Sequence, residues 1–101
     1  MSDALRPIYN HLGQIITEAL EQKEWQEASI DAEIDGDSGS FRGTYILTNK
    51  TTGEFDIPSD MFEFFNVLQM YFENEYKQKW NKATFTMTPE GKFTFNVKQQ
   101  A

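Results

Sequence analysis

The stretch that most constrains the fold is residues 56–80, DIPSDMFEFFNVLQMYFENEYKQKW, which joins a helix start to much of the aromatic content. Ser59 or Asp60 can cap a helix by accepting a bond from a free backbone N–H, and Asp60 with Glu63 fits a capping box. Two adjacent apolar stripes then follow at helical spacing: Met61, Phe65, Leu68, Phe72 and Tyr76, with Phe64, Val67 and Tyr71 beside them. So wide an apolar face predicts a helix that packs against a sheet or another helix.

The N-terminal segment, residues 3–24, also has the apolar spacing of a helix. Ser2 or Asp3 can cap it, and Pro7 is tolerated because it lies near the first turn. Its apolar residues form one face: Leu5, Ile8, Tyr9, Leu12, Ile15, Ile16, Ala19 and Leu20. We expect this face to pack on a sheet.

From residue 27 the hydrophobic period changes to two, which is typical of a half-buried strand. The inner positions are Ala28, Ile30, Ala32 and Ile34, and they alternate with Glu27, Ser29, Asp31, Glu33 and Asp35. The composition predicts a turn at 36–40, a second strand at 41–48 with Ile46 off the pattern, a turn at 49–53 and a short strand at 54–57.

Residues 83–88 and 92–97 have the pattern of a β-hairpin around the turn Pro89-Glu90-Gly91. The predicted order of elements is therefore α-β-β-β-α-β-β. We expect an α+β fold with two layers, an antiparallel five-stranded sheet and both helices on one face. Residues 1–101 are expected to form a single domain.

The composition narrows the class of protein. The first residues lack the pattern of a secretory signal, and no apolar run approaches the roughly 18 residues of a membrane span. Cysteine is absent, so disulfides, thiolate metal sites and a cysteine nucleophile are excluded. These features predict a cytoplasmic protein.

The net charge of −7 comes from nine Lys and Arg against sixteen Asp and Glu. Residues 1–60 carry twelve acids and four bases (−8), whereas residues 61–101 carry four acids and five bases (+1). An acidic chain binds nucleic acid poorly, because such binding depends on Lys and Arg at the phosphates. The charge favours a basic partner, with solubility alone as the alternative.

No enzymatic motif is visible, and we expect no catalytic residues and no cofactor. His11 is the only histidine, and no nucleophile is indicated beside it. The phosphate-loop, dinucleotide and zinc-protease motifs are absent. A hydrolase using only carboxylates stays open, although no spacing selects a pair.

A calcium loop deserves comparison because Asp31, Glu33, Asp35 and Gly36 match positions 1, 3, 5 and 6 of an EF-hand. Position 12, where a bidentate Glu is required, is Arg42. The flanking residues alternate as strands do, and residues 31, 33 and 35 of a strand lie in a line rather than around an ion. We therefore expect no metal site.

The acidic strand is the candidate partner-binding face. Like charges gathered on one strand face repel each other, and a basic partner would explain their proximity; a solvated outer face is the alternative. The candidate residues are Glu27, Asp31, Glu33 and Asp35, with Asp37 in the turn and Glu54 and Asp56 as secondary positions. An exposed edge strand is a second candidate site, because its free backbone groups can pair with another strand.

Short motifs across the chain resemble the YezG-like family of bacterial antitoxins, or immunity proteins. They are FDIPSD (55–60) before the aromatic helix, Trp80-Asn81 before ATFTMTPEGKFTFNV (83–97), and Glu24-Trp25 before the acidic strand. In that family an "IP" precedes a long helix, and a Trp introduces a hairpin with a turn close to "DGKF".

The resemblance implies a small cytoplasmic protein that binds and neutralises a cognate toxin, usually a nuclease delivered between bacteria. The expected mechanism is stoichiometric occlusion or immobilisation of the toxin by the acidic face. The alternative is a generic acidic adaptor that binds a basic protein without any toxin.

Overall fold

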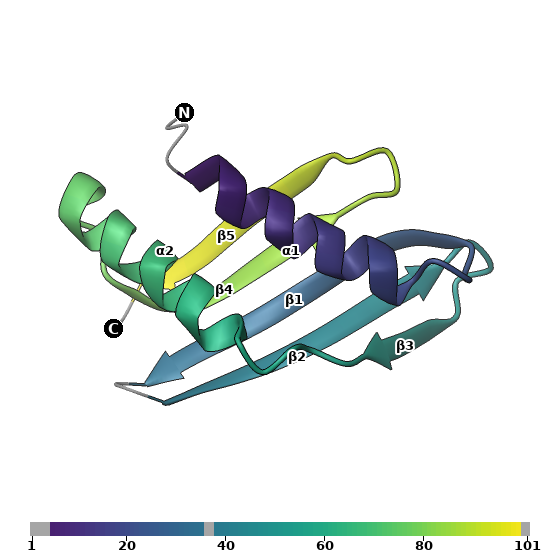
Figure 1. Ribbon diagram of the computed structural model, residues 1–101, viewed down its shortest axis with the longest axis horizontal. Helices are drawn as coiled ribbons and strands as arrows, with labels where there is room; N and C mark the ends of the chain where they lie inside the picture. The colour runs from purple at the N-terminus through teal and green to yellow at the C-terminus, as the bar shows by residue number, and fades with distance from the viewer. Residues whose placement is uncertain (1–4, 36–37, 100–101) are drawn as a thin grey trace.

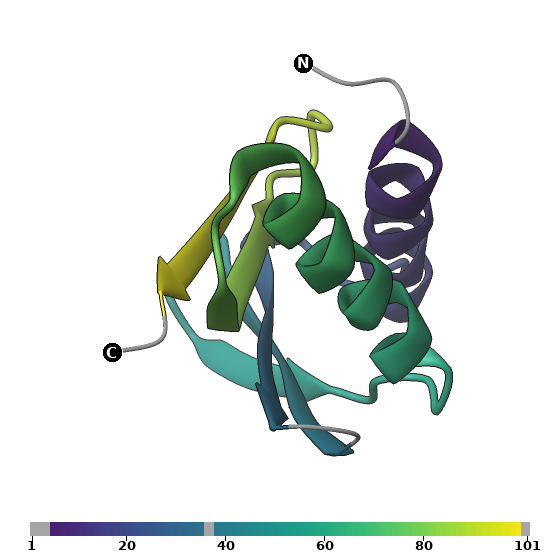
Figure 2. The same ribbon diagram turned by 90° about the vertical axis from the view of Figure 1, so that its left-hand side faces the viewer.

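The computed structural model describes residues 5–35 and 38–99, which form two helices and a five-stranded sheet (Figure 1). All strand pairs are antiparallel, and the spatial order is β3-β2-β1-β4-β5. Both helices lie on the same side of the sheet (Figure 2). The elements are α1 (Arg6–Ala19), β1 (Trp25–Asp35), β2 (Ser38–Leu47), β3 (Thr52–Phe55), α2 (Met61–Tyr76), β4 (Trp80–Met87) and β5 (Phe93–Gln99). The predicted α+β class, element order and two-layer arrangement are confirmed.

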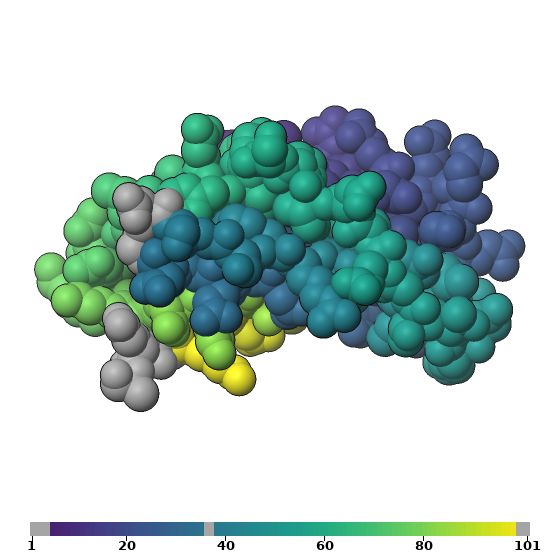
Figure 3. Space-filling view, turned by 90° about the horizontal axis from the view of Figure 1, so that it is seen from below, coloured from purple at the N-terminus to yellow at the C-terminus, as the bar shows by residue number. Residues whose placement is uncertain are grey.

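A hydrophobic core fills the space between the two layers. Each helix contributes fully buried residues, such as Ile16 from α1 and Phe65 from α2, and the sheet supplies Ile30 and Phe85 beneath them. Burial of one such side chain contributes about 1.5–3 kcal/mol. Viewed from the β3 side, the helix layer lies above the strands and parts of β5 appear below them (Figure 3). The opposite face of the sheet is not covered by any other element of the described chain.

The aromatic helix α2 spans the predicted stripe from Met61 to Tyr76 but is more exposed than its sequence predicts. It begins at Met61 after Asp60, whose side chain makes no capping bond, so the predicted capping box does not form. It ends at Tyr76, after which Lys77 adopts a left-handed conformation with φ of 55°. Within the first stripe Met61, Phe65 and Leu68 are buried, whereas Phe72 is half-buried and Tyr76 is 54% exposed. A helix that lies on one sheet buries only one of its sides. The second stripe, Phe64, Val67 and Tyr71, is therefore partly exposed to water, and Val67 is 48% exposed.

Helix α1 ends five residues earlier than predicted. Leu20, which follows the last residue of α1, is buried, and residues 21–24 are exposed because the chain turns there toward the start of β1 at Trp25. The expected caps at Ser2 and Asp3 lie outside the described residues.

Strand boundaries also shift. Strand β2 begins at Ser38, inside the predicted turn, because it pairs with β1 as far as Asp35. Strand β3 covers Thr52–Phe55 rather than 54–57. Gly43 of β2 lies opposite Phe55 of β3. Only glycine fits there without displacing the Phe55 ring, because a Cβ at position 43 would lie 2.6 Å from that ring.

The predicted hairpin forms, although β4 begins at Trp80 rather than at 83 and β5 ends at Gln99 rather than at 97. Its turn depends on Gly91. This glycine has a φ of +91°, which residues with a side chain rarely adopt, and its N–H donates to the Thr88 carbonyl at 2.9 Å. The Thr88 N–H donates to the Lys92 carbonyl at 2.9 Å and closes the hairpin.

Tyr9 connects α1 to the β4–β5 hairpin through aromatic contacts. Its ring centroid lies 6.2 Å from Phe85, 5.2 Å from Phe93 and 5.6 Å from Phe95. Burial in this cluster, with smaller effects of nearby tyrosines on α2, raises the pKa of Tyr9 to about 12. The neutral hydroxyl is therefore favoured in the folded state.

Two substitutions on α2 test the role of its buried stripe. Phe65→Ala should lower the free energy of unfolding by about 3–5 kcal/mol, because it leaves a cavity at a fully buried site. Val67→Ala, on the half-exposed stripe, should change it by no more than about 0.5 kcal/mol. Urea unfolding measures both, and equal effects would contradict the assigned faces.

The raised pKa of Tyr9 predicts a loss of stability at high pH. An unfolded tyrosine ionises near pH 10, so the stabilisation is fully present below pH 10 and is lost as the pH rises to about 12. The free energy of unfolding should fall more steeply with pH across this window in the wild type than in Tyr9→Phe. Parallel pH profiles for the two proteins would contradict the prediction.

Candidate protein-binding site

The acidic residues of β1 lie on the uncovered face of the sheet. Ala28, Ile30, Ala32 and Ile34 are buried beneath the helices, and the alternation of the strand directs their neighbours outward. The predicted residues Glu27, Asp31, Glu33 and Asp35 are all exposed. The structure therefore brings these four carboxylates to one face, as the sequence predicts.

The neighbouring strands place cations beside two of these carboxylates. Arg42 of β2 lies opposite Asp31, and Lys82 of β4 lies opposite Glu33. Lys98 of β5 lies opposite Lys82 on the far side of β4. The expected row of carboxylates is thus part of a face with mixed charge.

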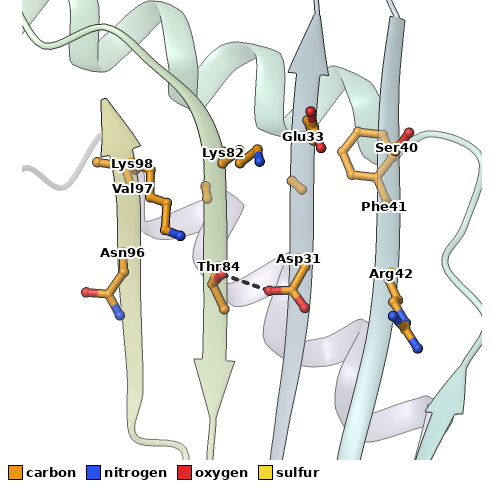
Figure 4. Close-up of a pocket in the computed structure, with 12 residues that line it drawn as sticks. Asp31, Glu33, Ser40, Phe41, Arg42, Lys82, Thr84, Asn96, Val97 and Lys98 are labelled. Atoms are coloured by element: carbon orange, nitrogen blue, oxygen red, sulfur yellow. Dashed lines mark hydrogen bonds between the residues drawn. The ribbon is translucent and has the colours of Figure 1, made fainter. Parts of the chain in front are cut away.

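Residues of β1, β2, β4 and β5 line a hollow of about 380 Å³ on this face (Figure 4). Lys82 extends from β4 toward β1 near Glu33, and the Lys98 side chain reaches from β5 toward β4. Neutral polar side chains, Ser40, Thr84 and Asn96, lie among the charged ones. Carboxylates, ammonium groups and hydroxyls therefore lie within a small area around the hollow, whose lining also includes the apolar residues Ala32, Phe41, Ala83 and Val97.

Two short contacts order the site. The Thr84 hydroxyl donates to Asp31 Oδ1 at 2.8 Å, which holds that carboxylate on the β4 side. Arg42 Nε donates to Glu54 Oε1 at 2.7 Å, so its guanidinium points toward β3 rather than toward Asp31. The bond with Glu54 and the charge of that carboxylate raise the pKa of Arg42.

The secondary candidates lie in different places. Glu54 is exposed on β3 and pairs with Arg42, whereas Asp56 is exposed in the connection between β3 and α2. Asp37 lies outside the described residues. Counting the outer-face residues of the described strands, five carboxylates (Glu27, Asp31, Glu33, Asp35 and Glu54) face three cations (Arg42, Lys82 and Lys98), a net charge of −2.

Sequence reasoning did not select Arg42, Lys82 or Lys98. Lys82 and Lys98 each lie one residue outside a predicted strand (83–88 and 92–97), at positions that continue its polar alternation. Lys82 approaches Glu33 because β4 pairs with β1, and Lys98 follows because β5 pairs with β4; these lysines are 49 and 65 positions from Glu33 (82 − 33 and 98 − 33).

The carboxylates that match a calcium loop in sequence are not arranged around a common point. Asp31, Glu33 and Asp35 lie along one extended strand, and Arg42 lies across from Asp31. Within residues 5–35 and 38–99, no group of three His, Asp or Glu side chains could hold a metal ion. The His11 ring contacts the Phe64 ring at a tilt of 32°, with ring centroids 4.4 Å apart.

The free edges of the sheet are β3 and β5. Strand β5 covers seven residues and β3 only four, so β5 offers the longer row of free backbone groups. Pairing of another strand with this edge stays a prediction. Neither helix of the described chain is long and apolar enough to cross a membrane.

No protein-family model matches this chain, and a search of curated proteins finds no match either.

Neutralising the exposed pair Arg42→Gln/Glu54→Gln should leave the urea midpoint of unfolding unchanged. Both side chains are more than 60% exposed, and water screens such pairs strongly. A large drop in the midpoint would show that the pair serves the fold rather than a partner. An unchanged midpoint would permit charge substitutions on this face to be interpreted as effects on binding.

Proposed function

We propose that this protein is a cytoplasmic immunity protein that binds and neutralises a cognate bacterial toxin, a nuclease, by one-to-one contact. The observation that carries the proposal is the uncovered outer face of the sheet, where Asp31 and Glu33 border a hollow. Together with Glu27 and Asp35 they form an acidic strip along β1, and Glu54 adds a carboxylate on β3.

Charge supports a basic partner. A nuclease must hold phosphates, so the surface around its active site is rich in Lys and Arg. A protein with a net charge of −7 attracts such a surface over long range and associates with it rapidly. Bound there, it would occlude or immobilise the toxin without any chemical step.

The resemblance to YezG-like antitoxins supports a toxin as the partner. The motifs that carry it lie at the β3–α2 connection, at the start of β4 and in the β4–β5 hairpin. The segment 83–97 forms most of β4 and β5 and contributes Ala83, Thr84, Asn96 and Val97 to the lining of the hollow, but none of its charged residues. The resemblance therefore supports the class of protein, whereas the charged face supports the place of contact.

A pull-down from the strain that encodes the protein tests the proposal. At low salt the tagged protein should capture a basic domain with nuclease activity in one-to-one ratio, and high salt should weaken capture. One equivalent of added protein should abolish the nuclease activity. Capture of a basic protein without nuclease activity would favour the adaptor alternative, and capture of no basic protein would contradict both.

Charge reversal tests the assigned face. Asp31→Lys/Glu33→Lys/Asp35→Lys should weaken toxin binding by a factor of about 100 or more, because three attractive contacts become repulsive. The matched control is Glu21→Lys/Glu75→Lys/Glu90→Lys, which changes the net charge equally at exposed sites away from the hollow.

Calorimetric titration measures both affinities, and thermal melting confirms that each variant is folded. Equal affinity losses in the two triple variants would show that the net charge acts without a defined face. An unchanged affinity in the first variant would contradict the assignment of β1.

A further inference from the structure

Lys82 and Lys98 form an arrangement that costs stability. They lie directly opposite each other on β4 and β5, and like charges in this position repel. Both side chains are exposed, and neither makes an ion pair with another side chain of residues 5–35 and 38–99. The contact between the two lysines therefore adds no attraction to the fold, whereas Lys82 also lies opposite Glu33 on its other side.

The two lysines stand at the edge of the hollow that holds Asp31 and Glu33. Lys82 lies between Lys98 and Glu33 in the order of the strands, so positive and negative charges adjoin across β4 and β1. The third cation, Arg42, is already paired with Glu54. The hollow therefore has a positive side on β4 and β5 and a negative side on β1 (Figure 4).

We propose that this hollow recognises a partner protein that carries an acidic side chain next to a basic one. The partner's carboxylate meets Lys82 and Lys98, and its Lys or Arg meets Asp31 and Glu33. This inference rests on the proposed function for the place of contact and adds the charge pattern of the partner.

A uniformly basic surface would fit this face poorly. It would press its own cations against Lys82 and Lys98, and such like-charge contacts disfavour wrong partners. The lysines would then select among basic surfaces, admitting those with a carboxylate at the right place. The acidic strip thus attracts basic surfaces, and the lysine pair favours those that also carry a carboxylate.

Two peptides that differ only by Glu and Gln test this pattern without the toxin. They are acetylated and amidated Ala-Lys-Gly-Glu-Ala and Ala-Lys-Gly-Gln-Ala, in which the two polar residues share one side of an extended chain. Binding is followed by NMR titration of the labelled protein at ~0.15 M salt, where long-range attraction is screened. The Glu peptide should bind about threefold more tightly, as expected for one exposed ion pair, although its charge is less positive.

Single reversals identify the lysines responsible. Lys82→Glu and Lys98→Glu should each abolish or invert the preference for the Glu peptide. Lys92→Glu is the matched control, because Lys92 is exposed at the opposite end of the same hairpin and should keep the wild-type preference. The exchange Glu33→Lys/Lys82→Glu keeps the net charge and should also remove the preference.

Equal or weaker binding of the Glu peptide to the wild-type protein would overturn the inference, as would a preference that survives Lys82→Glu and Lys98→Glu. Absence of binding by both peptides would overturn it as well. These outcomes are separable from failure of the proposed function, because a toxin can be captured and inhibited through the acidic strip without any preference for a neighbouring carboxylate.

Discussion

Pairing of β1 with both β2 and β4 is the interaction on which the rest of the structure depends. It puts a strand from the first half of the chain at the centre of the sheet and leaves β3 and β5 at the edges. The buried residues of β1 are Ala28, Ile30, Ala32 and Ile34, and they form part of the core beneath the helices, with Trp25 packed against it. Because strand side chains alternate, this burial forces the carboxylates of β1 onto the opposite face.

The same strand pairing also places cations beside those carboxylates. Considered along one strand, Asp31 and Glu33 belong to an acidic strip; considered across the sheet, they border a hollow that also holds Lys82 and Lys98. Water screens each of these exposed charges, so the arrangement adds little to folding. Its physical effect is on association, where the order of charges decides which surfaces are attracted and which are repelled.

The two layers divide the tasks of the molecule. The helix layer and the inner face of the sheet hold the aromatic cluster around Phe65, Phe85 and Tyr9, and substitution there acts on stability. The outer face contributes few buried apolar groups, so its charged residues are open to change without loss of the fold. This separation is what allows the binding experiments to be interpreted apart from the unfolding experiments.

Local patterns in the sequence determined the helices, the hairpin with its glycine turn, the order of elements and the inward face of β1, because periodicity reports burial directly. They also placed Glu27, Asp31, Glu33 and Asp35 together, since one strand contains all four. Helix ends were less predictable: α1 ends at Ala19 and α2 lacks its capping bond, because chain reversal and packing set those boundaries. Only the tertiary structure decided the strand order, and with it the approach of Lys82 and Lys98 to the acidic strip. Lys82 is 49 positions from Glu33 and Lys98 is 65 (82 − 33 and 98 − 33), and no local pattern encodes which strand lies beside which.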